Sequence, residues 1–327
     1  MVGAGALGFH HLRILRDLPG IELAGFFDDS LTRADEVSRE LQVPAFASLD
    51  DLIDACDAMT IVVPTPAHFE VSRRALARGR HLLIEKPLAT TLEQADELLH
   101  LAASNGAIIQ TGHVERFNRA IRAALPYVDH PLFIESDRLA PFNPRGSDVA
   151  VVLDLMIHDI DLVLTLVGAE VESVAGVGVP VLTPFVDIAN ARVTFATGAV
   201  ANITSSRVSR ERMRKLRIFQ KSGYLSLDLG AGEGEFYRMK GDLNLAELMR
   251  APQQLEAFVE RIALTAPEGE PLRLEFEAFA LALRGEGPVV VDGRAGREAL
   301  AVALRIVRDI ERSLPALTGG LPDSRRA

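Results

Sequence analysis

The sequence predicts an α/β protein with an N-terminal doubly wound parallel (Rossmann) sheet and an α+β C-terminal domain that has a large, mainly antiparallel sheet. Strand-like and helix-like runs alternate through the first 112 residues, which is the pattern of parallel sheets. Beyond residue 171, strand-like runs follow one another without helices, which indicates antiparallel pairing. We therefore expect a nucleotide-binding domain over 1–113 and a substrate-binding and oligomerisation domain over 114–327.

The composition is that of an ordinary globular chain with two domains. Its 327 residues are 48% hydrophobic and 24% charged, and about 150 residues per domain is usual. The net charge of -10 disfavours nucleic acid or an anionic membrane as a partner, because phosphate groups would be repelled on average. Cys56 is the only cysteine and no basic and apolar leader precedes the first motif, so we expect a cytoplasmic protein. Residues 319–327 lack apolar periodicity and are expected to be mobile.

The chain opens with a glycine-rich turn of the dinucleotide-binding type. A G-x-G-x-x-G motif leads into a helical pattern, and a strand-like run ends at Asp28, about 20 residues after the last glycine. The helix N-terminus would offer its amides to a pyrophosphate. The Asp28 carboxylate would accept hydrogen bonds from a ribose and repel a 2′-phosphate, so NAD is expected and NADP is less favoured. A purely structural glycine turn is the alternative. The expected cofactor contacts here are Gly3, Gly5, Ala6, Leu7, Gly8, Asp28 and Arg33.

The first strand is nearly absent from the sequence. Only Met1 and Val2 precede Gly3, whereas a strand usually has about five residues. Two interpretations stay open: the true start lies upstream, or the fold tolerates a short first strand. In the first case, added upstream residues would raise stability, since each restored hydrogen bond contributes about 1 kcal/mol.

Two further predicted strands end in polar residues. The run 58–63 leads into a loop that carries Thr65 and His68, and the run 82–87 delivers Glu85 and Lys86 to the sheet edge. Open α/β sheets bind ligands at the carboxyl ends of their strands. We therefore expect these four side chains beside the cofactor, although His68 could instead cap the following helix.

A dense polar run follows the last parallel strand. His113, Glu115, Arg116 and Asn118 lie within six positions. Such a run is either a solvated domain junction or a rim that faces the substrate, and its place after a parallel strand favours the rim.

The apolar run 149–167 is predicted to form a helix with a polar inner face. Asp154 and His158 are spaced i, i+4 and therefore share one side. A carboxylate beside an imidazole orients it and favours its protonated form, which suits a base that takes a hydroxyl proton. A structural histidine is the alternative for this helix taken alone. Its charged residues argue against a membrane span.

Strand-like runs from 171 to about 240, among them 216–220, predict the antiparallel sheet, with one face on this helix and the other free for a subunit contact. Arg207 closes one of the runs and could reach an anionic ligand or form a surface salt bridge. The basic cluster 210–217 is expected in a solvated loop. Further helices are predicted over 271–283 and 296–313, and the last is expected to pack back on the first domain.

Together these motifs resemble the Gfo/Idh/MocA oxidoreductases over almost the whole chain. The resemblance rests on the glycine motif, on Glu85-Lys86-Pro87 after the fourth parallel strand, and on Asp154-x-x-x-His158-Asp159. The near-absent first strand departs from the family pattern. Within the family, the most similar members are UDP-N-acetylglucosamine 3-dehydrogenases, which supply a 3-keto sugar to an aminotransferase. That similarity lies in Gly112–Asn118, Pro144-Arg145-Gly146 and Val152–Asp161.

The resemblance implies NAD-dependent oxidation of a sugar hydroxyl, with C3 of UDP-N-acetylglucosamine as the expected position. His158 would take the hydroxyl proton while hydride passes to the nicotinamide. Lys86 would stabilise the developing charge on oxygen, and Asp154 would orient His158. No metal is implied. The candidates for holding the sugar or its diphosphate are His113, Glu115, Arg116, Asn118, Arg138 and Arg207.

Other functions on the same scaffold stay open. They are a dehydrogenase of a free sugar, inositol or sugar acid, a glycosidase that uses NAD transiently, and a non-catalytic sugar-sensing protein. The joint presence of Lys86, Asp154 and His158 favours an enzyme. The expected partners are a small-molecule substrate and further copies of this chain, as a dimer or tetramer.

Overall fold

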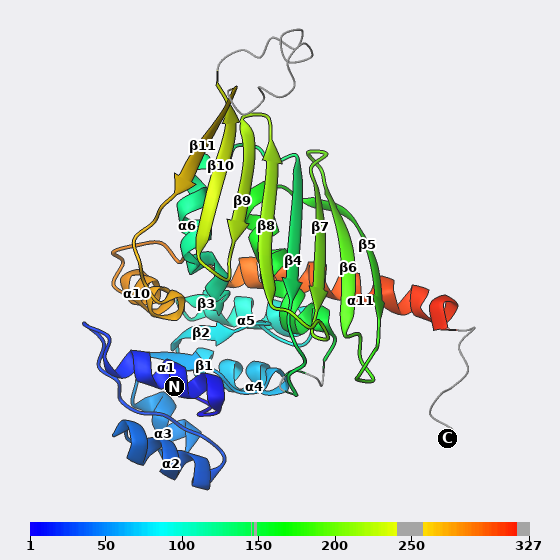
Figure 1. The fold of residues 1–327 in the computed structure, drawn as a ribbon. Coiled ribbons are helices and arrows are strands. Elements are labelled where there is room, and N and C mark those ends of the chain that lie inside the picture. Colours follow the sequence, from blue (N-terminus) through cyan, green and yellow to red (C-terminus); the bar gives the residue numbers. More distant parts are fainter. Residues whose placement is uncertain (145, 147–148, 241–257, 319–327) are drawn as a thin grey trace, which may run out of the picture. The chain divides into compact units, whose positions relative to one another are not determined.

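The structure, a computed structural model, describes residues 1–144, 146, 149–240 and 258–318 (Figure 1). Arg145 and the tail 319–327 lie outside the described residues. The chain divides into two compact units, Met1–Phe117 with Gly269–Ala301, and Asn118–Glu268 with Val302–Ala327. The last helix therefore contributes its first turns to one unit and the rest to the other.

A parallel sheet forms the centre of the first unit. Its strands are β1 (Ala58–Ile61), β2 (His81–Glu85) and β3 (Ile109–Gly112). They pair in that order and run parallel. Single parallel bridges extend the sheet beyond β1. Val2 pairs with Ile61 on one side and with Phe27 on the other, and Phe26 pairs with Ala45. The resulting order is that of a doubly wound sheet, as the sequence predicts.

The helices of the first unit are α1 (Ala6–Arg16), α2 (Leu31–Leu41), α3 (Leu49–Asp54), α4 (Thr65–Leu76), α5 (Leu92–Ser104), η1 (Val114–Phe117, a 3-10 helix) and α10 (Pro271–Leu283). Several begin at a capping side chain. Ser30, Ser48 and Thr91 each accept a hydrogen bond from the amide three residues further on, at the starts of α2, α3 and α5. Local sequence therefore sets where these helices start.

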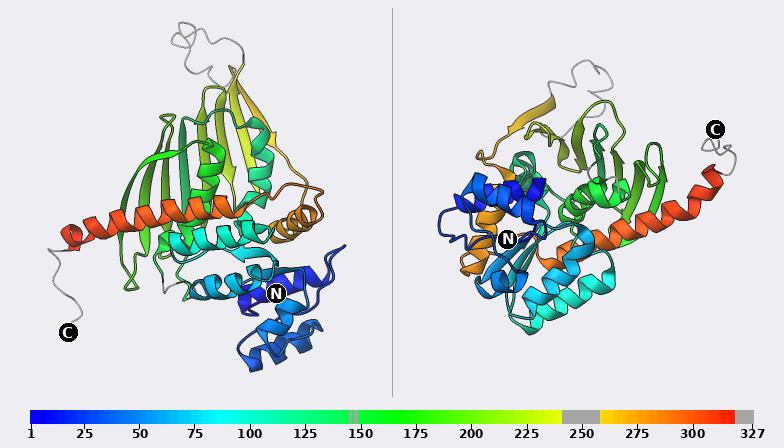
Figure 2. Two further views of the ribbon diagram at one scale, coloured as in Figure 1. Left: turned by 180° about the vertical axis from the view of Figure 1, so that it is seen from behind. Right: turned by 90° about the horizontal axis from the view of Figure 1, so that it is seen from below.

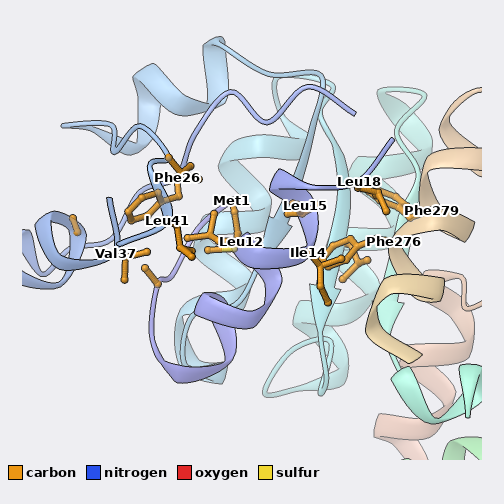
Figure 3. Packing of buried hydrophobic residues seen from close by; sticks show 14 residues of the cluster. Met1, Leu12, Ile14, Leu15, Leu18, Phe26, Val37, Leu41, Phe276 and Phe279 are labelled. Carbon is orange, nitrogen blue, oxygen red and sulfur yellow. The ribbon is translucent and has the colours of Figure 1, made fainter. Parts of the chain in front are cut away.

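One apolar cluster packs α1 against α10 and the sheet (Figure 3). Leu12 and Leu15 of α1 are buried in this cluster together with Phe26, while Phe276 and Phe279 come from α10. Each such side chain contributes about 1.5–3 kcal/mol when it is fully buried. This packing explains why α10 belongs to the first unit in spite of its late position in the chain.

The short first segment is paired on both sides. Val2 donates its amide to the Thr60 carbonyl at 2.9 Å, and Phe27 donates its amide to the Met1 carbonyl at 2.9 Å. The α-amino group of Met1 is buried and donates to the Gly25 carbonyl at 2.9 Å. Burial lowers the pKa of this amino group to about 6. A cavity of about 370 Å³ lies beside it, lined in part by Met1, Gly25 and Cys56.

The second unit is built on a sheet that has eight strands among the described residues, in the order β11-β10-β9-β8-β4-β7-β6-β5. Only the pairing of β4 with β7 is parallel, and the other pairs are antiparallel. The strands are β4 (Phe133–Leu139), β5 (Val171–Val179), β6 (Ile188–Phe195), β7 (Val200–Ser206), β8 (Met213–Gln220), β9 (Gly223–Asp228), β10 (Glu233–Met239) and β11 (Val259–Leu264).

Helices cover one face of this sheet, as the view from behind shows (Figure 2). They are α6 (Arg119–Ala124), the short η2 (Leu125–Tyr127), α7 (Ile157–Val167) and the part of α11 (Gly293–Thr318) that belongs to this unit. A Cβ on Gly176 of β5 would lie 3.1 Å from Ile310 Cγ1, so α11 packs closely on that strand. Among the described residues, no helix covers the opposite face.

The structure corrects several expectations. Helix α4 begins at Thr65, so Thr65 and His68 lie in its first turn rather than in a loop, because Pro66 is well tolerated there. Part of the basic cluster, Arg214 to Arg217, lies in β8 rather than in a solvated loop. Lys215 and Arg217 alternate with the buried Leu216 and Ile218 on the strand. Strand β11 was not expected. No helix among the described residues is both long and apolar enough to cross a membrane.

Candidate active site

The glycine-rich turn has the shape that a dinucleotide needs. Gly3 has φ +91, and a Cβ there would lie 2.7 Å from the Val62 carbonyl oxygen. A Cβ on Gly8 would lie 1.9 Å from the Gly3 carbonyl oxygen, whereas one on Gly5 would meet nothing within 4 Å. Helix α1 starts directly after Gly5, and no side chain caps it. Its N-terminal amides therefore face an open, exposed turn, which fits the diphosphate of NAD. Ala6 and Leu7 form its first turn.

Two charged side chains are fixed against this turn through Ala4. The Asp28 carboxylate accepts the Ala4 amide at 2.6 Å and the Ser30 amide at 3.0 Å. Arg33 donates to the Ala4 carbonyl at 2.8 Å and lies 3.2 Å from Glu36. Asp28 is thus held against the glycine turn, its proposed contact with a ribose stays a prediction, and Arg33 pairs with Glu36.

The end of β2 carries a buried carboxylate directly before Lys86. Glu85 is buried, and its Oε1 lies 3.2 Å from Nε2 of His11, which is fully buried on α1. Burial alone would raise the pKa of the Glu85 carboxyl, but the hydrogen bond and charge of His11 and the charge of Lys86 hold that pKa below its usual value. Lys86 is half-buried, and its bond to Pro87 is cis. His11 was not among the predicted site residues, because its only sequence signal is a polar residue beside Leu12 on the inner face of α1.

The first turn of α4 lies next to the same segment. His68 is buried, and its Nδ1 and Nε2 lie 2.9 Å from the carbonyl oxygens of Pro87 and Val63. Burial lowers the pKa of His68, although these two acceptors oppose the change. Both ring nitrogens thus face the backbone, and His68 ties the end of β1 to the residue after Lys86. Thr65, at the start of the helix, is half-buried.

The polar run after β3 folds as η1 and the start of α6 and is mostly buried. His113 and Glu115 are buried, and Arg116 donates to the Val290 carbonyl at 3.4 Å. Asn118 caps α6, because its Oδ1 accepts the Ala120 amide at 3.0 Å, and its amide group donates to the Leu229 carbonyl at 2.9 Å. Arg116 therefore bonds within the first unit, and Asn118 bonds within the second.

In the second unit, the helix that carries Asp154 and His158 does not begin as a regular α-helix. It opens with η3 (Val152–Met156), a π-helix, and continues as α7. A π-turn inside a helix frequently marks a functional site. Asp154 lies in the π-helix and His158 in the first turn of α7, and both are partly exposed. Gly146 packs on Asp154, since a Cβ there would lie 2.6 Å from the Asp154 carboxylate.

Two arginines expected at the rim are buried and bonded within the second unit. Arg138 is 4% exposed and donates to the Asp159 carboxylate at 2.6 and 3.1 Å, while Ser136 donates to the same carboxylate at 3.0 Å. Arg207 is 3% exposed and donates to backbone carbonyls. Both guanidinium groups therefore form internal contacts of the second unit, Arg138 with a carboxylate and Arg207 with backbone carbonyls. A surface salt bridge, the alternative for Arg207, is excluded by its burial.

The candidates thus fall into two groups, each within its own unit. The first unit holds the glycine turn, Asp28, Arg33, Thr65, His68, Glu85, Lys86, His113, Glu115 and Arg116. The second unit holds Asn118, Arg138, Asp154, His158 and Arg207. Among the residues that the structure describes, no group of three or more His, Cys, Asp or Glu side chains could bind a metal ion.

The sheet order and the glycine turn define a dinucleotide-binding fold. Residues 1–113 match the family described as "Oxidoreductase family, NAD-binding Rossmann fold", and residues 133–226 match the "GFO/IDH/MocA C-terminal domain". The chain belongs to the Gfo/Idh/MocA family of oxidoreductases, and its cofactor is NAD.

Comparisons with individual proteins agree with this family assignment. The chain is 38% identical over 307 residues, 94% of its length and 95% of the relative's, to UDP-N-acetylglucosamine 3-dehydrogenase from Acidithiobacillus ferrooxidans. A solved structure of that enzyme superposes with a TM-score of 0.87 and covers 96% of this chain and 97% of its own. The chain is also 29% identical over 230 residues, 64% of its length and 67% of the relative's, to scyllo-inositol 2-dehydrogenase (NAD(+)) from Bacillus subtilis. Levoglucosan dehydrogenase, solved with NADH and levoglucosan, shares the fold at 17% identity and a TM-score of 0.83, over 95% of this chain and 96% of its own.

Proposed function

We propose that this protein oxidises the C3 hydroxyl of UDP-N-acetylglucosamine to a ketone with NAD. The observation that carries the substrate is the 38% identity to a UDP-N-acetylglucosamine 3-dehydrogenase over 94% of this chain. The ketone would then be the substrate of an aminotransferase, which would yield a 2,3-diamino sugar.

The reaction assigns a distinct task to each of three side chains. His158 accepts the proton of the hydroxyl group as the C–H bond breaks. Lys86 donates a hydrogen bond to the same oxygen and stabilises its developing negative charge. Asp154, one turn before His158, orients the imidazole and stabilises its protonated form. NAD, when bound, supplies the hydride acceptor. Neither Lys86 nor His158 is fully buried, which supports these roles.

The surroundings of Lys86 support its role further. The backbone amide of Lys86 donates to Glu85 Oε2 at 3.2 Å, and His11 holds the other oxygen of that carboxylate. The Lys86 backbone is therefore fixed by Glu85 at the end of β2, which is in turn held by His11 of α1. His68 adds a third constraint through the Pro87 carbonyl. We propose that Glu85 and His68 act on the cofactor site by holding this segment, with Thr65 contacting the cofactor directly.

The substrate contacts are proposed from the first unit and the start of the second. Arg116 is the partly exposed member of the polar run, and an arginine suits the diphosphate of a nucleotide sugar by its bidentate geometry. His113 and Glu115 belong to the same run and are proposed as further substrate contacts. Asn118 and Arg138 are proposed to act indirectly, since the first caps α6 and the second anchors α7 through Asp159.

The open face of the large sheet supports a homo-oligomer. Ring pairs run across four strands on this face, with centroids of Phe133 and Phe219 at 5.8 Å, Phe219 and Tyr224 at 4.8 Å, and Tyr224 and Tyr237 at 5.7 Å. Phe219 is 37% exposed. We propose that a second copy covers this aromatic row. Light scattering should then show a dimer or tetramer that Phe219→Asp weakens, and a monomer at micromolar concentration would contradict the proposal.

A dehydrogenase of a free cyclitol is the second candidate function, favoured by the similarity to scyllo-inositol 2-dehydrogenase over 64% of this chain. One assay separates the two. The protein is incubated with NAD and UDP-N-acetylglucosamine, N-acetylglucosamine or scyllo-inositol, and an aminotransferase removes any 3-ketone. NADH formed only with the nucleotide sugar supports the proposal, whereas NADH formed only with scyllo-inositol would replace it by the second candidate.

A further inference from the structure

Arg207 is committed to the protein backbone rather than to a ligand. It directly follows β7, and its guanidinium donates to the carbonyl oxygens of Gly146 and Val149, the latter at 2.5 Å, and approaches that of Val186 at 3.5 Å. Its Nε lies 3.6 Å from Asp187 Oδ1. A charged group that bonds to several carbonyls fixes the segments to which those carbonyls belong.

Asp187 holds this arginine from the other side. Its Oδ2 accepts the amides of Val181, Leu182 and Thr183 at 2.7 to 2.8 Å. Burial would raise the pKa of the Asp187 carboxyl, but these hydrogen bonds outweigh burial and hold that pKa below its usual value. Asp187 is therefore a fixed anion, and Arg207 is held between it and the backbone carbonyls.

The carbonyls that Arg207 holds lead directly to Asp154. Gly146 has φ +77, and a Cβ there would lie 2.6 Å from Asp154 Oδ2 and 2.8 Å from Cγ. The Gly146 backbone thus packs on the carboxylate itself. Val151, at the start of η3, donates its amide to the Val186 carbonyl at 2.8 Å, the carbonyl that Arg207 also approaches. The Gly146 backbone and the start of η3 both position Asp154, and the guanidinium of Arg207 contacts the carbonyls that hold both segments.

We propose that Arg207 is a positioning residue, which holds Gly146 and the start of η3 so that the carboxylate of Asp154 stays aligned with His158. The inference rests on the proposed roles of Asp154 and His158. It differs from the sequence expectation that Arg207 binds the sugar or diphosphate, and the two make opposite kinetic predictions. A contact to phosphate acts on KM for the nucleotide sugar, whereas alignment of Asp154 acts on kcat.

The test compares Arg207→Met with Gly146→Ala, whose added Cβ would displace Asp154 while Arg207 stays in place. Arg210→Met is the matched control, because Arg210 is exposed three residues further on. We expect both site variants to lower kcat by about 10- to 100-fold, as small misplacements of catalytic groups do. KM for UDP-N-acetylglucosamine and the Kd of NAD should stay within about threefold. Combining Arg207→Met with Asp154→Asn should cost no more than Asp154→Asn alone, since coupled residues are not additive.

A second readout does not depend on turnover. In protein labelled at histidine with ¹³C, the ring signal of His158 should shift in the same direction in Arg207→Met, Gly146→Ala and Asp154→Asn, and stay in place in Arg210→Met. If Arg207→Met does not fold, Gly146→Ala alone carries both measurements. An unchanged His158 signal in folded Arg207→Met, or a rise in KM above about tenfold at constant kcat, would overturn the inference. Absence of turnover with the nucleotide sugar, with the His158 shifts as expected, would instead overturn the proposed function alone.

Discussion

Nε2 of His11 lies 3.2 Å from Oε1 of Glu85, and both residues are buried. His11 belongs to the helix that follows the glycine turn, and Glu85 is the last residue of β2. The other ring nitrogen of His11 lies 3.4 Å from the Thr60 hydroxyl. One imidazole therefore connects the nucleotide-binding helix to the strand that presents Lys86.

Removing His11 should destabilise the protein strongly. In His11→Ala the buried Glu85 carboxylate loses its side-chain partner, and removing the partner of a buried charge costs about 3–5 kcal/mol. Urea unfolding measures the change. His10→Ala is the control, because His10 is exposed on the same turn, and it should cost less than about 0.5 kcal/mol. Equal effects of the two substitutions would contradict the assigned importance of the pair.

Features that depend on neighbouring residues could be predicted from the sequence, whereas contacts between distant residues could not. Helix starts at Ser30 and Thr91, the sheet order and the positions of Lys86 and Asp154 follow from local patterns. The partner of Glu85 does not, because His11 is 74 positions away in the sequence, counted as 85 minus 11. The same holds for Arg138, since an arginine in a strand is ordinarily solvated and only the fold brings Asp159 to it.

The helix 149–167 shows a second limit. Its apolar pattern predicts a helix, but no pattern of residue types distinguishes the π-turn Val152–Met156 from an α-turn. The start of β8 shows a third limit, because a strand was expected only from Leu216, and the basic residues Arg214 and Lys215 before it were assigned to a loop although the strand begins at Met213. Charge composition suggested a loop where period-two burial makes a strand.

Asp28 should set the preference for NAD. Asp28→Asn keeps an acceptor for the Ala4 amide but removes the charge that repels a 2′-phosphate. We expect the ratio of NADP to NAD affinity to rise by at least about tenfold, equivalent to about 1.4 kcal/mol. Calorimetric titration with both cofactors measures the ratio, with Asp29→Asn as the exposed neighbouring control. An unchanged ratio would remove Asp28 from discrimination.

In a chain that begins at Met1, the buried amino group should make stability depend on pH. Its pKa falls from 8.0 to about 6 on folding, so between these values the unfolded chain binds more protons than the folded one. Stability should therefore rise as pH increases from 6 to 8, by up to about 2.7 kcal/mol at 1.36 kcal/mol per pKa unit. Urea unfolding at several pH values measures this rise. Acetylation of the amino group should flatten it, and a stability that falls over this range would contradict the assignment.

An apolar extension placed before Met1 should also stabilise the first unit. The cavity of about 370 Å³ beside Met1 is lined by residues 21–25 and 55–60, on the two segments that Met1 and Val2 bridge. Four added residues of high β-propensity would pair there and replace the buried amino group by a peptide bond. We expect the free energy of unfolding to rise by a few kcal/mol, at about 1 kcal/mol per hydrogen bond. Protection of Cys56, which lines the cavity, from a thiol reagent would report filling, and unchanged melting and unchanged Cys56 reactivity would argue against it.

Lys86 should contribute to turnover through charge rather than packing. Lys86→Met keeps the length of the side chain but removes the ammonium that stabilises a developing oxyanion. Loss of one such donor costs about 10²–10³ in kcat. Binding of NAD should weaken less than kcat falls, since the glycine turn and Asp28 are intact. A variant that retains full kcat would exclude the proposed role.

The most direct test of the account follows hydrogen from C3 of the sugar. UDP-N-acetylglucosamine carrying deuterium at C3 is incubated with NAD and either the native protein or His158→Ala, with an aminotransferase to remove the ketone, and the isotope content of NADH is read by mass spectrometry. The native protein should give deuterated NADH. His158→Ala should form it about 10² to 10⁴ times more slowly while still binding NAD, because a positioned base contributes that factor. NADH without deuterium, or an undiminished rate in His158→Ala, would contradict the proposed reaction at C3 or the proposed base.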